Sequence, residues 1–199
     1  SNQQKKKKKK MLKDKHLRNV SSQFSKTQPK PRKKFGCTVA EVFSPERFTT
    51  RVKEVGQKGK AYDIKLGCDL DNPATKKHTR QELEELSPAL LILSPPCTMC
   101  GGWMHLNKHK MPMHVYLGRL AQAKRFIRFA LLLARDQLAR GGQALLEHPW
   151  PSLLWKMPEA MELLQIMHLV RVDMCAFELR CPENQLPMKK DTGLLVSHE

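Results

Sequence analysis

The segment "SPPCTMC" (residues 94–100) places a thiol directly after two prolines and a second thiol three residues later. Proline fixes the backbone angle φ, so two consecutive prolines hold the next side chain in a defined place. A cysteine thiolate can act as a nucleophile or as a metal ligand. Three interpretations are open: a nucleophile at Cys97, a metal site that includes Cys97 and Cys100, or two structural thiols in a turn.

The carboxyl group of Glu147 ends another apolar run, "QALLEHP" (143–149), far from Cys97 in the sequence. A carboxylic acid beside a thiolate can supply the proton that a nucleophilic addition requires. The two groups can cooperate only if the fold brings both to one place. The alternative is that Glu147 forms only a local cap or ion pair at the end of its strand.

The apolar pattern predicts the elements that must position these residues. Short apolar runs predict strands at 38–43, 61–66, 88–93, 143–149 and 169–174. Amphipathic segments predict helices at 47–56, 79–86, 117–140 and 152–167, the last broken near Pro158. Thr79 is the predicted N-cap of the second helix, with Glu82 completing a capping box. This alternation predicts an α/β fold, with a Rossmann-like, mostly parallel sheet and helices on both faces.

The unusual loops of the chain all follow predicted strands. They are residues 44–45, 67–69, 94–100 and 147–149. In a parallel sheet the carboxyl ends of the strands meet at one edge, and ligands bind there. We therefore expect Cys97 and Glu147 at the same edge of the sheet.

Charge is distributed unevenly along the chain. Of 199 residues, 36 are basic and 19 are acidic, a formal net charge of +17. Residues 1–35 hold 14 of the basic residues and one acid, so this segment carries +13 and residues 36–199 carry +4. Few apolar residues and no sustained period predict a disordered Lys-rich tail at 1–35. Such a tail is simply solvated, binds phosphates, or acts as a nuclear-import signal.

The composition argues against a secreted or membrane-spanning protein. No segment has the pattern of a signal peptide, and no apolar run approaches the roughly 20 residues that span a bilayer. Six cysteines dispersed along the chain do not resemble a disulfide scaffold. We predict a nuclear or cytoplasmic location and no membrane partner. Because the first residue is Ser1, we also expect a fragment or a processed chain.

Pro95-Pro96-Cys97 and Glu147 together resemble the motifs of the cytosine-5 DNA methyltransferases, which are class I enzymes that use S-adenosylmethionine. The resemblance implies that Cys97 adds to position 6 of cytosine while N3 is protonated by Glu147, so that C5 takes the methyl group of the cofactor. The target base would be flipped out of a duplex or already single-stranded. The implied cofactor-binding residues lie within, at the ends of or just beyond the first three predicted strands: Phe43, Ser44, Asp63, Asp69, Ser94 and Pro95.

A closer resemblance is to methyltransferase-like segments of retrotransposon polyproteins. The motifs that carry it are, in order, "EVFSPERF" (41–48), "YDIKLGCDL" (62–70), "SPPCTM" (94–99), "GGQALLEHPW" (141–150) and "DMCAF" (173–177). Together they cover about residues 39–197. The resemblance implies an incomplete methyltransferase-like α/β domain at 36–199, derived from a mobile element, with nucleic acid as its partner.

The helix predicted at 117–140 carries basic residues on one arc, away from its apolar face. Lys124, Arg128 and Arg135 are the candidate nucleic-acid-binding residues of this arc. The alternative is an ordinary solvated helix surface.

Two hypotheses of different classes follow. Working methyltransferases have a glycine-rich cofactor loop, whereas Phe43 is followed here by Ser-Pro-Glu-Arg (44–47), without glycine. This loop favours a non-catalytic segment that keeps the fold and an affinity for nucleic acid. Cys97 and Glu147 favour an enzyme.

A zinc site is a third hypothesis. It would combine Cys97 and Cys100 with His105, Cys175 or Cys181. Structural zinc needs four ligands, usually in two close pairs, and the second pair of cysteines is more widely spaced than usual. No metal is therefore predicted.

Overall fold

The computed structural model describes residues 35–101, 104 and 108–197. The predicted tail at 1–35 lies outside these residues, except for Phe35. The described residues form one six-stranded sheet: β1 (Cys37–Val42), β2 (Gly59–Tyr62), β3 (Pro88–Leu93), β4 (Gln143–Pro149), β5 (His168–Asp173) and β6 (Asp191–Val196). The order across the sheet is β2-β1-β3-β4-β6-β5.

Neighbouring strands pair in parallel across most of the sheet, and one strand reverses. β1 pairs in parallel with β2 and β3, and β3 pairs in parallel with β4. β6 lies antiparallel between β4 and β5. The predicted α/β fold is confirmed, but the sheet is mixed. The apolar pattern did not predict β6, whose sequence "DTGLLV" contains Gly193, and glycine weakens the signal of a strand.

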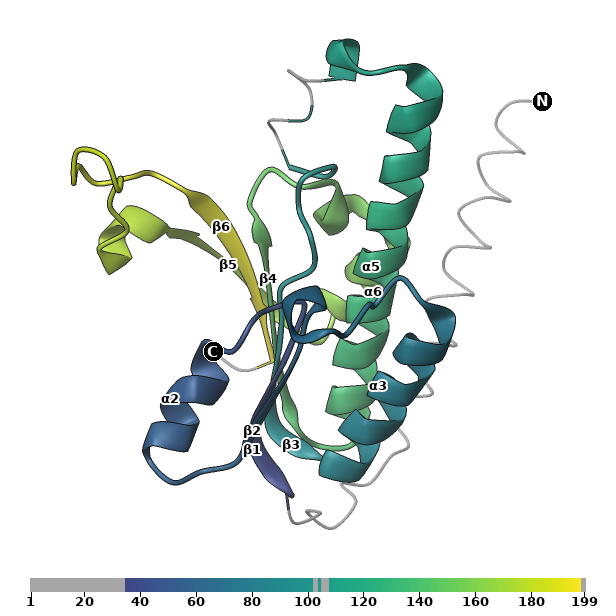
Figure 1. The fold of residues 1–199 in the computed structure, drawn as a ribbon, viewed down its shortest axis with the longest axis vertical. Coiled ribbons are helices and arrows are strands. Elements are labelled where there is room, and N and C mark those ends of the chain that lie inside the picture. Colours follow the sequence, from purple (N-terminus) through teal and green to yellow (C-terminus); the bar gives the residue numbers. More distant parts are fainter. Residues whose placement is uncertain (1–34, 102–103, 105–107, 198–199) are drawn as a thin grey trace, which may run out of the picture. The chain divides into compact units, whose positions relative to one another are not determined.

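Helices lie on both faces of the sheet, as predicted (Figure 1). On one face, α2 (Phe48–Glu54) packs against β1 and β2. The other face carries α3 (Pro73–Leu86), α5 (Met113–Ala139) and α6 (Pro158–Leu163). Short 3-10 turns complete the described elements: η1 (Ile64–Leu66), η2 (Lys108–Lys110), η3 (Leu153–Lys156) and η4 (Met174–Phe177).

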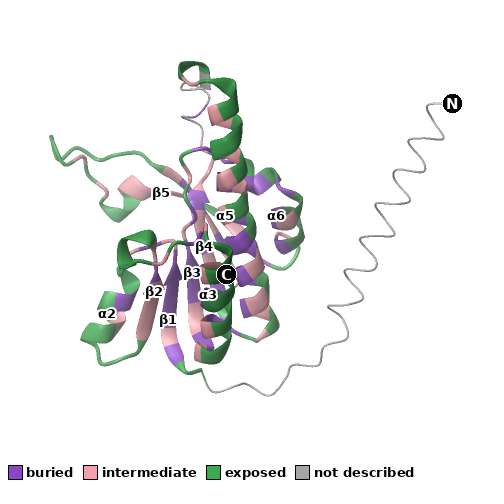
Figure 2. Ribbon diagram, turned by 45° about the vertical axis from the view of Figure 1, so that its right-hand side comes forward, coloured by how far each residue is buried: buried purple, intermediate pink, exposed green. Residues whose placement is uncertain are grey.

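The main core lies between α5 and the central strands. Leu91, Leu93 and Leu146 from the strands, and Ile127 from α5, have no exposed surface. Figure 2 shows buried residues along the central strands and the inner side of α5. Burying one such side chain contributes about 1.5–3 kcal/mol relative to leaving it exposed. This packing fixes α5 against β3 and β4, the strands that lead into the candidate site.

The predicted N-cap at Thr79 is wrong. α3 begins at Pro73, and the side chain of Asn72 accepts hydrogen bonds from the backbone N–H groups of Ala74 (2.8 Å) and Thr75 (3.3 Å). Asparagine at the N-cap followed by proline is a favoured helix start. Thr79 is buried inside the helix instead.

Two other predicted boundaries, at the end of β2 and at the start of α6, can be compared with the structure. The predicted strand at 61–66 is shorter and starts earlier, because Asp63 caps η1 by accepting a hydrogen bond from the backbone N–H of Lys65 (2.9 Å). The predicted break near Pro158 is confirmed, since α6 begins at this proline after η3.

In the described part of the chain, no helix has both the length and the apolar character needed to cross a bilayer. All six cysteines are free thiols.

Candidate functional site

Cys97 and Glu147 follow neighbouring parallel strands. β3 and β4 pair with Leu93 opposite Leu146. Cys97 comes shortly after Leu93 in the sequence, and Glu147 comes directly after Leu146. The structure therefore brings both residues to the carboxyl edge of the sheet.

The two residues nevertheless face different surroundings. Alternate residues of a strand point to opposite faces. Leu146 and His148 are buried on the face that α5 covers, so Glu147 points to the face that carries α2. Its Oε1 lies 3.5 Å from Nζ of Lys190, and 29% of its side chain is exposed. Glu147 is thus paired with a lysine at the edge of the sheet.

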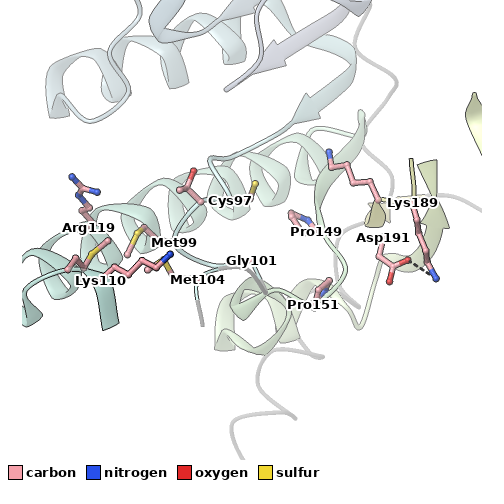
Figure 3. A pocket seen from close by; sticks show the side chains of 13 residues that line it. Cys97, Met99, Gly101, Met104, Lys110, Arg119, Pro149, Pro151, Lys189 and Asp191 are labelled. Atoms are coloured by element: carbon pink, nitrogen blue, oxygen red, sulfur yellow. Dashed lines mark ion pairs between the residues drawn. The ribbon is translucent and has the colours of Figure 1, made fainter. Parts of the chain in front are cut away.

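Cys97 lines a cleft of about 910 Å³. The cleft is lined by Cys97, Thr98, Met99, Gly101, Met104, Lys110, Met111, Arg119, Pro149, Pro151, Lys189, Lys190 and Asp191. Figure 3 shows Cys97 between two walls: Met99, Met104, Lys110 and Arg119 lie on one side, and Pro149, Pro151, Lys189 and Asp191 on the other. The first wall comes from the loop after β3 and the start of α5, and the second comes from the end of β4 and the start of β6.

The cleft combines positive charge with apolar surface. Among the described residues, its charged lining consists of Lys110, Arg119, Lys189, Lys190 and one acid, Asp191. Asp191 is already engaged, since Nη2 of Arg171 lies 2.8 Å and Nζ of Lys189 lies 3.9 Å from its carboxylate. Methionine and proline side chains form the apolar part of the lining. Such a cleft suits an anionic ligand with a flat or apolar body.

The backbone after the two prolines holds Cys97 in a tight turn. The carbonyl oxygen of Cys97 accepts hydrogen bonds from the N–H groups of Cys100 and Gly101, both at 2.9 Å. The N–H of Ser94 donates to the carbonyl of Val42 at 3.1 Å, which ties the start of the loop to β1. Cys97 is half-buried, whereas Cys100 lies in the core.

His148 lies near the backbone of Pro96. It has no exposed surface, and neither ring nitrogen has a hydrogen-bond partner among the described residues. Its ring packs edge-on against Trp155 with the ring centroids 6.3 Å apart. Burial lowers the pKa of His148 to about 4, and the nearby carbonyl of Pro96 opposes this shift only in part. A buried, neutral imidazole therefore lies near the Pro-Pro segment that precedes Cys97.

The strand order reverses between β1 and β3, with β2 on one side and β4 on the other. Ligands of α/β sheets bind outside the carboxyl ends of the strands at such a switch point. The residues that follow β1 and β3 here are Phe43, Ser44, Ser94 and Pro95, four of the six predicted cofactor residues. The structure thus brings these four positions together.

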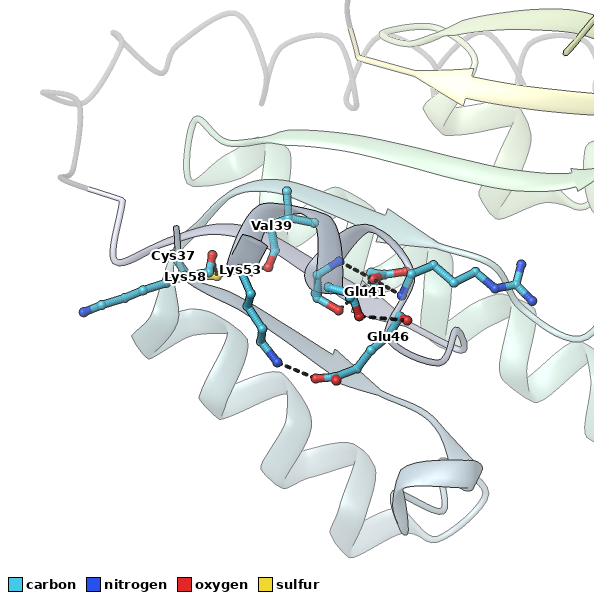
Figure 4. Close-up of polar contacts among 9 residues, drawn as sticks. Cys37, Val39, Glu41, Glu46, Lys53 and Lys58 are labelled. Atoms are coloured by element: carbon cyan, nitrogen blue, oxygen red, sulfur yellow. Dashed lines mark hydrogen bonds and ion pairs between the residues drawn. The ribbon is translucent and has the colours of Figure 1, made fainter. Parts of the chain in front are cut away.

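The buried carboxylate of Glu41 closes the loop between β1 and α2 (Figure 4). Oε1 of Glu41 accepts hydrogen bonds from the N–H of Arg47 (3.0 Å), the N–H of Thr49 (2.7 Å) and the hydroxyl of Thr49 (2.9 Å). Oε2 accepts one from the hydroxyl of Ser44 (3.0 Å). Backbone N–H groups at the start of a helix commonly hold the anionic part of a ligand. In this chain those donors already have an internal acceptor.

Phe43 is also engaged within the protein. Its backbone has a φ of 62°, in the left-handed region that bulky residues rarely adopt. Its ring packs edge-on against Phe126 and Phe129 of α5, with centroid distances of 5.5 and 6.3 Å. Phe43 therefore links the switch point to α5.

The two acids among the predicted cofactor-binding residues lie in turns near β2. Asp63 follows β2 directly, and its Oδ1 caps η1. Asp69 is exposed, and its Oδ1 accepts a hydrogen bond from the N–H of Asp71 (2.9 Å). Asp63 lies nearer to the switch point, because the N–H of Phe43 donates to the carbonyl of Tyr62 (2.9 Å).

The predicted nucleic-acid-binding residues of α5 are spread along the helix. From Lys124 to Arg135 the helix rises by about 16 Å. Lys124 lies close enough to Cys100 to influence its ionisation. Arg128 pairs with Glu159 (2.8 Å), and Arg135 is exposed.

The apolar pattern of the sequence does not indicate which charged residues line the cleft. Lys189, Lys190 and Asp191 reach it because β6 runs antiparallel beside β4, so that its first residues meet the last residues of β4. Recognising a further strand after the one predicted at 169–174 would have placed Lys189 and Lys190 at the carboxyl edge of the sheet. Arg119 was missed because it lies outside the arc of Lys124, Arg128 and Arg135.

The zinc hypothesis has no support in the described part of the chain. There, no group of three or more His, Cys, Asp or Glu side chains is arranged to hold a metal ion. His105, one predicted ligand, lies outside the described residues.

No protein-family model and no curated protein matches the chain.

Replacing Glu41 by alanine is expected to destabilise the fold strongly. The change leaves the N–H groups of Arg47 and Thr49 without their buried acceptor, which costs about 2–4 kcal/mol of unfolding free energy. Urea denaturation followed by circular dichroism measures this loss. The matched control is Glu46→Ala, because Glu46 is exposed and forms only an ion pair with Lys53; its midpoint is expected to stay unchanged. Equal midpoints for the two variants would show that Glu41 does not hold the loop.

His148 is expected to make stability depend on pH between about 6.5 and 4. Below pH 6.5 the unfolded chain binds a proton at this imidazole, while the folded chain does so only near its lowered pKa. The unfolding free energy should therefore fall with pH across this window by roughly 3 kcal/mol. Urea titrations at several pH values should show a shallower slope for His148→Leu, and an unchanged slope for His114→Gln at an exposed position. A wild-type slope in His148→Leu would contradict this assignment.

Proposed function

We propose that this chain is a methyltransferase-like domain, related to the cytosine-5 DNA methyltransferases and derived from a mobile element. In this proposal it binds nucleic acid and presents Cys97 to a pyrimidine base, without transferring a methyl group. The observation that carries the proposal is the position of Cys97 in a cationic, methionine-lined cleft at the carboxyl edge of the sheet.

The lining of the cleft supports a nucleotide as its occupant. Lys110, Arg119, Lys189 and Lys190 can neutralise phosphates, which supplies most of the non-specific affinity for nucleic acid. The methionine side chains offer an adaptable apolar surface for a base. A base that is flipped out or single-stranded could then reach the thiol. The +13 charge of residues 1–35 would add a general attraction for phosphates.

The arrangement of the parallel strands supports the resemblance to class I methyltransferases. β2, β1, β3 and β4 are parallel, and their order reverses between β1 and β3. This arrangement favours a Rossmann-like sheet with a ligand site at the switch point. The motifs that imply the relationship lie around this edge, including Pro95-Pro96-Cys97 after β3 and Glu147 at the end of β4.

The loop after β1 favours a protein that does not use S-adenosylmethionine. Glu41 accepts from the N–H groups of Arg47 and Thr49 at the start of α2, and Phe43 packs against α5. A cofactor would have to displace these internal contacts before its own could form. The residues present therefore fit the cofactor poorly, while the nucleic-acid side of the site is open.

The chemistry left to such a site is reversible addition to the pyrimidine ring. The Sγ of the Cys97 thiolate forms a bond to C6, the electron pair of the C5–C6 double bond shifts to C4–C5, and the pair of the N3–C4 double bond moves to N3, which takes up a proton. No other group leaves, so loss of the N3 proton and elimination of the thiolate restore both partners. The proton can come from water or from a positioned acid. Lys190 beside Glu147 is placed at this edge and lines the cleft.

A single-stranded oligonucleotide that contains pyrimidin-2-one is expected to trap the wild-type protein covalently. This base lacks the 4-amino group of cytosine, so its C6 accepts a thiolate more readily and the adduct persists. The adduct should survive a denaturing gel, disappear with Cys97→Ser and remain with Cys175→Ser, which changes a thiol outside the cleft. Circular dichroism of each variant checks that it is folded. Equal trapping of Cys97→Ser and wild type would exclude Cys97 as the nucleophile.

A second candidate function is methyl transfer itself. It is favoured by the placement of Cys97 and Glu147 at the same edge of the sheet, next to a switch point. This function requires the cofactor, which the first proposal does not.

Calorimetric titration with S-adenosylmethionine separates the two functions. We expect no binding heat up to millimolar cofactor, because the N–H groups of Arg47 and Thr49 at the start of α2 already donate to Glu41. S-adenosylhomocysteine, which lacks the positive sulfonium, serves as the companion ligand. Saturable binding of either ligand with one site per chain would replace the first proposal by the second.

A further inference from the structure

Cys97 and Cys100 are the first and fourth residues of one hydrogen-bonded turn. The N–H of Cys100 donates to the carbonyl of Cys97 at 2.9 Å, as does the N–H of Gly101. The ends of a β-turn lie less than about 7 Å apart between Cα atoms. Disulfides join Cα atoms about 4.4–6.8 Å apart. The backbone therefore already holds the two residues at a separation that a disulfide can span.

Gly101 helps to hold this turn closed. A Cβ added at position 101 would lie 3.4 Å from the carbonyl oxygen of Cys97 and 3.9 Å from Cγ of Pro149. Both distances are ordinary van der Waals contacts, so it is the N–H of Gly101, which donates to the carbonyl of Cys97, that ties this residue to the turn.

The two thiols differ in accessibility in a way that gives them different roles. Cys97 lines the cleft, where a small solute can reach it. Cys100 is 5% exposed and lies in the core beneath the turn. Burial raises the pKa of Cys100, the ammonium of Lys124 lowers it, and the negative charge of the Cys97 thiolate raises it.

We propose that Cys97 and Cys100 form a reversible disulfide when the protein meets a hydroperoxide, and that this modification removes the free thiol from the cleft. Formation of the disulfide does not depend on the function proposed above. Its consequence does rest on that function, because an oxidised Cys97 cannot add to a pyrimidine.

The chemistry has two steps. The Cys97 thiolate attacks one oxygen of hydrogen peroxide, the O–O bond breaks, and Cys97 becomes a sulfenic acid while hydroxide leaves. Loss of the Cys97 charge then eases ionisation of Cys100, which attacks the Cys97 sulfur and releases a second hydroxide. With the two thiol protons, the products are one disulfide and two molecules of water. A dithiol reverses the reaction by exchange and is itself oxidised.

Peptide mapping after peroxide treatment tests the disulfide directly. In the wild type, peroxide should remove alkylation at both cysteines and lower the mass of their peptide by two hydrogen atoms, and dithiothreitol should restore both sites. In Cys100→Ser, the sulfenic acid at Cys97 has no partner thiol, so dimedone should label it. The wild type should show almost no dimedone adduct at Cys97 under the same conditions.

The control variant is Cys175→Ser, which removes a half-buried thiol that does not line the cleft. It should form the Cys97–Cys100 disulfide to the same extent as the wild type. Unchanged alkylation of Cys97 after peroxide, or equal dimedone labelling in the wild type and Cys100→Ser, would overturn the proposal.

Pyrimidin-2-one trapping then reports the consequence separately. Peroxide should abolish trapping of the wild type, and dithiothreitol should restore it. If the disulfide forms but the reduced protein never traps the oligonucleotide, the function proposed above fails while the modification site stands.

Discussion

The parallel pairing of β3 with β4 is the constraint on which the candidate site depends. With Leu93 opposite Leu146, the Pro-Pro segment and Glu147 leave the sheet at one edge. A shift of one residue in β4 would exchange the faces of Leu146 and Glu147, placing a carboxylate in the core beneath α5. The cost of burying an unpaired charge there fixes the register. Core packing and site geometry therefore have the same origin.

The two halves of this edge differ in whether their polar and charged groups already have partners inside the protein. At the switch point, Glu41 and Phe43 satisfy their contacts inside the protein, which leaves the loop after β1 rigid and self-contained. Beside β4, lysine and arginine side chains surround a cleft whose charges are only partly matched by acids. An internal carboxylate stabilises the first half without a ligand, whereas the second half still has positive charge to neutralise. This contrast explains why we favour nucleic acid over a nucleotide-like cofactor.

The sequence predicted the α/β class, the helices on both faces and the shared edge of Cys97 and Glu147, because strong apolar periodicity marks buried strands. It failed at β6, where Gly193 interrupts the pattern. Gly193 is required there, since a Cβ would lie 2.6 Å from Cζ2 of Trp155. Tertiary packing of this kind has no local signal. The same failure concealed Lys189 and Lys190, which reach the cleft only through the reversal of β6.

The turn from Cys97 to Cys100, which follows the two prolines, is held in place by its surroundings. Pro96 lies near the buried ring of His148, and Cys100 is anchored in the core, with its carbonyl accepting a hydrogen bond from the N–H of Leu153 at 3.0 Å. The backbone of the turn is therefore held at both ends, while the two side chains can still change rotamer. A fixed turn holds one thiol toward the cleft and another behind it. The turn that holds Cys97 at the cleft also keeps Cys100 near it, so the proposed reactivity toward a base and the proposed reactivity toward an oxidant would have one structural cause.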